Sequence, residues 1–112
     1  MNLINKILVP VDGSESSKRA LKYAKELAEK LPGEITLLHV YELPVQFTDF
    51  EDRSETFSNL SEDIKIYGQK ILDESEKQIA TPQMNINKLL LEGHKGNTIT
   101  EIAEQNNFDL II

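Results

Sequence analysis

The sequence predicts an α/β fold in which a parallel sheet carries helices on both faces. Short, almost wholly apolar segments alternate along the chain with longer segments whose apolar residues recur every three or four positions. Their order is strand, helix, strand, helix, strand, helix, strand, and such alternation is typical of parallel sheets with helical connections. The 112 residues are the right number for one domain.

The first half of the chain predicts two strands and one helix. Residues 6–11 (Lys-Ile-Leu-Val-Pro-Val) are an apolar run that predicts a buried strand, and the Asp-Gly pair at 12–13 predicts a turn after it. Ser14 is the expected N-cap of an amphipathic helix, which Pro-Gly at 32–33 ends. Residues 35–41, rich in β-branched and aromatic side chains, predict a second buried strand.

The second half predicts two further helices and two further strands. A long helix is expected from about 58 to 80, with a core-facing stripe of Leu60, Ile64, Tyr67 and Ile71. Residues 86–91 predict a third strand, and Thr-Ile-Thr-Glu at 98–101 matches a capping box at the start of a short helix. Residues 108–112 predict a fourth strand.

The net charge of −7 is concentrated in one segment. Residues 42–63 hold seven acidic residues and one arginine, which leaves a net charge of −1 for the rest of the chain. Charge runs are usually solvated connections. The alternative is a loop that aromatic contacts tether or that covers a site, because four aromatic residues lie in or beside it: Tyr41, Phe47, Phe50 and Phe57.

Composition excludes several classes of protein and partner. The chain has no cysteine, so it has no disulfide, thiolate zinc site or catalytic thiol. Its longest apolar runs are too short to cross a membrane, and its first residues lack the features of a secretory signal. No basic stripe is available for nucleic acid. We therefore expect a cytoplasmic protein that binds neither membrane nor nucleic acid.

The end of the first strand is the strongest candidate for a site. Pro10 lacks the N–H that a central strand needs, which is tolerable near the carboxyl end, where open α/β sheets bind ligands; the alternative is that the proline simply ends the strand. Asp12-Gly13-Ser14 then delivers a carboxylate to a helix N-terminus. One glycine here does not make a dinucleotide fingerprint, and no P-loop lysine follows. Asp12 is suited to a ribose hydroxyl, an adenine amine or a metal ion; the alternative is that it only caps the turn.

The two histidines do not form a catalytic set with any serine. His39 lies in an apolar strand, which favours a packed or hydrogen-bonded core histidine. His94 and Lys95 follow the third strand between two glycines, where either side chain is a candidate to meet a phosphate; the alternative is a flexible connection. Because no nucleophile, base and orienting group occur together, enzyme catalysis is not expected.

Four stretches, in order, resemble universal stress protein domains. They are residues 7–14 (Ile-Leu-Val-Pro-Val-Asp-Gly-Ser), 37–40 (Leu-Leu-His-Val), Glu-Gly at 92–93 with the helix after it, and 108–112 (Phe-Asp-Leu-Ile-Ile). The resemblance implies a Rossmann-like parallel sheet in the order 3-2-1-4-5. It also implies an ATP site, with Mg²⁺ as a possible companion, that would include Pro10, Val11, Asp12, Gly13, Ser14, Val40 and Gly93.

In members of that family that bind ATP, a glycine-rich motif after the fourth strand holds the phosphates. The chain ends at Ile112, where that motif would begin. Our expectation is therefore a single domain, residues 1–112, that lacks the motif, the last helix and the fifth strand, and whose full-length form is a homodimer. The expected function is an ATP-binding stress-response regulator. The alternative is a dimeric interaction protein of the same fold that binds no nucleotide; slow ATP hydrolysis or phosphotransfer is a remote third option.

Overall fold

The computed structural model describes residues 6–30, 33–43, 55–82 and 84–112, and for residues 55–58 the backbone alone. Strands and helices alternate through these residues in the predicted order. The strands are β1 (Lys6–Pro10), β2 (Glu34–Tyr41), β3 (Asn85–Glu92) and β4 (Leu110–Ile111). The helices are α1 (Glu15–Lys30), α3 (Glu55–Ile79) and α4 (Lys95–Gln105). None of these described helices is both long and apolar enough to cross a membrane.

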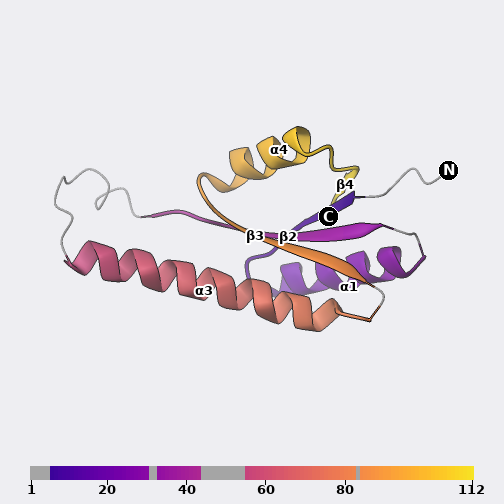
Figure 1. The fold of residues 1–112 in the computed structure, drawn as a ribbon, viewed down its shortest axis with the longest axis horizontal. Coiled ribbons are helices and arrows are strands. Elements are labelled where there is room, and N and C mark those ends of the chain that lie inside the picture. Colours follow the sequence, from indigo (N-terminus) through magenta and orange to yellow (C-terminus); the bar gives the residue numbers. More distant parts are fainter. Residues whose placement is uncertain (1–5, 31–32, 44–54, 83) are drawn as a thin grey trace.

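The four described strands form one parallel sheet in the order β3-β2-β1-β4, as expected for the four strands that the sequence supplies. Helices α1 and α3 cover one face of the sheet, and α4 covers the other (Figure 1). The chain adds strands in one direction from β1 to β3, and then returns to place β4 on the far side of β1. The carboxyl end of β1 is therefore a topological switch point, the place where open α/β sheets bind ligands.

Successive strand residues point to opposite faces and supply two apolar clusters. The larger cluster lies between the sheet and helices α1 and α3; its buried strand residues are Ile7, Val9, Ile35 and Leu37, and Val11 joins it just after β1. The smaller cluster lies against α4, and its strand residues are Leu8, Leu38 and Val40. Burial on both faces explains why the first two strands have continuous apolar sequences instead of alternating ones.

The predicted stripe of α3 is correct at Ile71, which is buried, and at Leu60 and Ile64, which are half-buried, but it is wrong at Tyr67. Tyr67, which we expected to face the core, is 63% exposed, and Gly68 is buried beside it. The buried positions of the helix are Gly68, Ile71, Leu72, Ser75 and Ile79. Glycine contributes nothing to a hydropathy pattern, so the approach of the helix to the sheet at this position is hidden in the sequence.

Helix α4 begins three residues before the predicted capping box, which is therefore wrong. Its N-cap is His94, whose side chain makes no capping hydrogen bond, and Thr98 lies inside the helix. The Glu42 carboxylate, just after β2, instead accepts a hydrogen bond from the Lys95 N–H at 3.2 Å. A carboxylate is favourable there because the N–H groups at a helix start carry partial positive charge.

The acidic segment is consequently not one solvated connection. Glu42 joins the end of β2 to α4, and residues 55–63 belong to α3, which starts three residues before the predicted position. Residues 44–54, and with them the idea that this segment covers a site, lie outside the described residues.

Pro10 is tolerated in β1 because the backbone N–H that it lacks would point toward β4 and not toward β2. The carbonyls of Lys6 and Leu8 accept hydrogen bonds from Asp109 and Ile112 at the β4 side, and Pro10 has the same orientation as Leu8. On the β2 side, the ladder continues past the proline because the Val11 N–H donates to the Leu38 carbonyl at 2.8 Å. Pro10 therefore removes no hydrogen bond between β1 and β2. It removes only the donor that would extend the β1–β4 ladder beyond Leu8.

Candidate functional site

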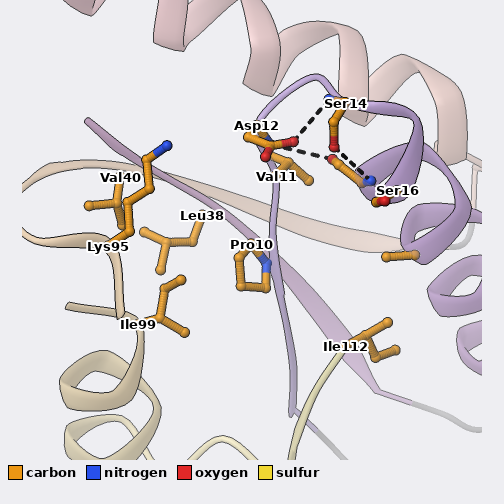
Figure 2. Close-up of a pocket in the computed structure, with 12 residues that line it drawn as sticks. Pro10, Val11, Asp12, Ser14, Ser16, Leu38, Val40, Lys95, Ile99 and Ile112 are labelled. Carbon is orange, nitrogen blue, oxygen red and sulfur yellow. Dashed lines mark hydrogen bonds between the residues drawn. The ribbon is translucent and has the colours of Figure 1, made fainter. Parts of the chain in front are cut away.

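A pocket of about 370 Å³ opens between the β1–α1 turn and the start of α4 (Figure 2). Its volume is within the range of roughly 300–1,000 Å³ that is usual for small-molecule sites. The larger apolar side chains that line it are Pro10, Val11, Leu38, Val40, Ile99 and Ile112. The polar ones are Asp12, Ser14, Ser16, Ser17 and Lys95. An apolar surface with a few polar groups of both charges suits a ligand with a flat apolar part and a polar end.

Five of the seven residues that the family resemblance implied line this pocket: Pro10, Val11, Asp12, Ser14 and Val40. Gly13 and Gly93 do not line it. Gly13 forms the turn between Asp12 and Ser14, with a φ of +83°, a conformation that costs glycine nothing and other residues a steric clash. Gly93 lets the chain pass close to α4, because a Cβ on it would run into Thr98 Oγ1.

Asp12, Ser14 and Ser17 form a hydrogen-bonded turn that connects β1 to α1. The Ser14 N–H donates to Asp12 Oδ1 at 2.9 Å, and the Ser17 N–H donates to Ser14 Oγ at 3.1 Å. The Ser17 hydroxyl in turn accepts the Asp12 N–H at 3.4 Å. Ser14 is thus the N-cap, as predicted, and Asp12 does cap the turn. Figure 2 shows these bonds at the edge of the pocket.

The electrostatics of the turn keep Asp12 ionised. Hydrogen bonds from Ser14, through its hydroxyl and then its backbone N–H, lower the pKa of Asp12 from the ordinary 3.8, and the Lys95 ammonium lowers the same pKa further. A carboxyl group whose pKa is lower in the folded state stabilises the fold at pH values above its ordinary pKa. That contribution is lost as the pH falls through the lower, folded-state value. Near neutral pH the pocket therefore presents a carboxylate, which accepts hydrogen bonds and donates none.

Ser14→Ala tests the capping role. We expect the free energy of unfolding to fall by about 1 kcal/mol, because the Ser17 N–H loses its acceptor at the helix start. Ser16→Ala is the matched control on the same turn of helix: its hydroxyl accepts only from Arg19, at 3.2 Å, among the described residues. Urea unfolding of both variants measures the difference, and equal losses would assign Ser14 no special role.

His39 holds the end of β1 from the other face of the sheet. Its side chain is 7% exposed, and its Nδ1 lies 2.8 Å from the Val11 carbonyl oxygen. A carbonyl only accepts, so Nδ1 carries the hydrogen and donates it. The prediction of a hydrogen-bonded core histidine is confirmed. The bond also ties Val11, which lines the pocket, to β2.

Of the two residues after β3 that were considered for a phosphate, only Lys95 lines the pocket. His94 is exposed at the N-cap of α4. The sequence did not single out the remaining lining residues: Ser16, Ser17, Ala20, Leu38, Ile99 and Ile112. Leu38 had one available signal, because it lies two residues before Val40 and so shares its face of the strand.

The chain matches the model of the universal stress protein family over residues 4–112. It is 33% identical to the universal stress protein MJ0531 of Methanocaldococcus jannaschii over 99% of its own length and 64% of that protein's. It is 28% identical to the universal stress protein YxiE of Bacillus subtilis, covering 98% of this chain and 78% of that one. The chain thus spans 64% of the length of the first relative and 78% of the length of the second.

Solved structures have the same fold. UspA of Lactobacillus plantarum superposes with a TM-score of 0.78 at 23% identity, over 96% of this chain and 74% of that one. The hypothetical protein MJ0577 superposes with a TM-score of 0.70 at 29% identity, over 98% and 74%. A universal stress protein solved in complex with cAMP superposes with a TM-score of 0.71 at 21% identity, over 98% and 75%. On the strength of the family match along nearly its whole length, this chain belongs to the universal stress protein family.

Proposed function

We propose that the pocket binds an adenine nucleotide, with ATP as the leading ligand, and that the domain acts as a stress-response regulator through its bound and free states. The observation that carries this proposal is the pairing of an ionised Asp12 with an apolar surface at the switch point of the sheet. One similar structure was solved with cAMP, which is itself an adenine nucleotide.

The proposed contacts follow from the chemistry of the lining residues. Pro10, Val40 and Ile99 offer apolar surface to the adenine ring. Asp12 uses Oδ1 for the Ser14 N–H, but a carboxylate has about four acceptor positions, so it can also accept a ribose hydroxyl or the adenine amine. The apolar surface supplies affinity, and the carboxylate supplies orientation.

Calorimetry with ATP, in the presence and in the absence of Mg²⁺, tests the proposal. We expect saturable binding, and we expect Asp12→Ala to weaken it by about 1–3 kcal/mol because a hydrogen bond to a charged group is lost. Asp12→Asn separates two effects: its side-chain oxygen still accepts the Ser14 N–H, so the turn survives while the charge is removed.

Glu101→Ala is the control for a change in net charge, because Glu101 is an exposed carboxylate on α4 that does not line the pocket. The Glu101→Ala variant should bind ATP with the same affinity as the unaltered protein. If no heat of binding is measured at millimolar nucleotide, the proposal is refuted. The alternative, an interaction protein of the same fold, is then favoured. If the affinity of Asp12→Ala for ATP is unchanged, the only role of Asp12 is to cap the turn between β1 and α1.

A further inference from the structure

The pocket has two ends, which lie on opposite faces of the sheet. Val40 and Ile99 line the end on the α4 face, where they belong to the smaller apolar cluster. Ala20 and Ile112 line the other end, where they pack against the larger cluster between α1 and the sheet. In Figure 2, Ile99 and Ile112 lie on opposite sides of Pro10. A ligand that fills the pocket therefore passes over the carboxyl edge of the sheet.

The placement of the adenine ring against Val40 and Ile99 determines which end receives a phosphate. Asp12 directly follows β1, the strand that lies between β2 and β4 in the sheet. The ribose connects the base to the phosphate, so a ribose at Asp12 with its base toward β2 places the phosphate on the side of β4 and α1. Lys95, one helical turn from Ile99 at the start of α4, lies at the adenine end instead.

Arg19 brings a positive charge to the end of the pocket that faces β4. It is an exposed residue of α1, and its Nη2 donates to Ser16 Oγ at 3.2 Å, which holds the guanidinium back toward the start of the helix. Ser16 lines the pocket, although Arg19 itself does not. Among the described residues Arg19 makes no ion pair, whereas the adjacent Lys18 is paired with Glu15. A guanidinium has five N–H donors, so the bond to Ser16 leaves others for a ligand.

We propose that Arg19 and Ser16 form the subsite that receives the phosphate of a bound nucleotide, and that through it the pocket distinguishes AMP from adenosine. This inference rests on the proposed nucleotide function and adds two residues of α1 to it. The Ser16 hydroxyl accepts from Arg19 and keeps its own hydrogen to donate to a phosphate oxygen. The guanidinium beside it offers paired N–H groups, whose geometry matches that of a phosphate.

Calorimetry with adenosine and with AMP, without metal and at low salt, tests the subsite. The unaltered protein should bind AMP more tightly than adenosine. Arg19→Gln should weaken AMP by about threefold to tenfold, the effect of one exposed charge-assisted contact, and leave adenosine within about twofold. Ser16→Ala should weaken AMP by about twofold to fivefold, because one hydroxyl donor is lost. Arg19→Lys should keep part of the preference for AMP, and added salt should reduce that preference because it screens the charges.

Lys22→Gln is the matched control. Lys22 is exposed one turn further along α1 and does not line the pocket, so its replacement removes the same charge from the same helix. Equal weakening of AMP in Lys22→Gln and Arg19→Gln would overturn the inference, because only the general field of the helix would then matter. Equal weakening of adenosine and AMP in Arg19→Gln would overturn it as well, since Arg19 would then support only the shape of the pocket. A preference for AMP that Lys95→Gln abolishes and Arg19→Gln preserves would place the phosphate at α4 and refute the subsite.

The two proposals fail in different ways. If adenosine binds and AMP binds no more tightly, the pocket is a nucleoside site and the phosphate subsite is refuted. If neither compound binds to the unaltered protein or to any variant, the nucleotide function is refuted, and the subsite falls with it.

Discussion

Replacing Leu37 with alanine should lower the free energy of unfolding by about 3–5 kcal/mol, and replacing its neighbour Leu38 should cost less, about 2–3 kcal/mol. Both side chains are fully buried, but they lie in different clusters on opposite faces of the sheet. Leu37 is enclosed between β2 and helices α1 and α3, so its removal leaves a cavity that the surroundings fill only in part. Leu38 lines the pocket, so the vacated space joins an opening that water already reaches.

Urea unfolding of the two variants under the same conditions measures this difference. The chemistry of the substitution is identical and the positions are adjacent, so strand propensity and the unfolded state contribute equally to both. A second readout separates them: Leu38→Ala should change the affinity for adenosine, and Leu37→Ala should not. If Leu38→Ala loses more stability than Leu37→Ala, the conclusion that Leu38 lines an open pocket is contradicted.

Gly68→Ala should lower the free energy of unfolding by about 1–3 kcal/mol, although alanine is the better helix former by about 1 kcal/mol. A Cβ on Gly68 would lie 2.7 Å from His39 Cδ2 and 2.7 Å from Leu90 Cδ1. The His39 ring has little freedom to yield, because its Nδ1 donates to the Val11 carbonyl. Relief of the clash therefore breaks that hydrogen bond or moves α3 away from the sheet.

Gly96→Ala is the control, and the sign of its effect should be opposite. Gly96 lies in the first turn of α4, where the nearest atom to an added Cβ is His94 Cε1 at 4.0 Å. The substitution meets open space, so the gain in helix propensity should appear as a small stabilisation. If both variants are stabilised, the close approach of α3 to β2 at Gly68 is not a constraint on the fold.

The two glycines show which local features a sequence pattern reveals and which it hides. Gly13, between an apolar run and a helix, predicts a turn, and the structure places it there with a positive φ. Gly68 interrupts no pattern, and Tyr67 beside it appeared to complete an apolar stripe. Only the packing of α3 across β2 and β3 shows that the residue nearest the sheet has to lack a side chain.

The start of α4 shows a second limit of local patterns. Residues 98–101 match a capping box, yet the helix starts at Lys95, whose N–H donates to the Glu42 carboxylate from a distant part of the chain. The bond joins residues 53 positions apart, and no local rule includes such a pair. This earlier start also brings Lys95 to the pocket.

The sequence alone determined the class of fold, the order of its elements and the turn at Asp12-Gly13-Ser14. These features depend on the periodicity of apolar residues and on turn and capping chemistry, which act between neighbours in the chain. The tertiary structure decided which residues share the pocket. Leu38, Lys95, Ile99 and Ile112 reach it from three further segments, and they meet the Asp12 turn because the parallel pairing of the strands brings strand ends and helix starts to one edge of the sheet.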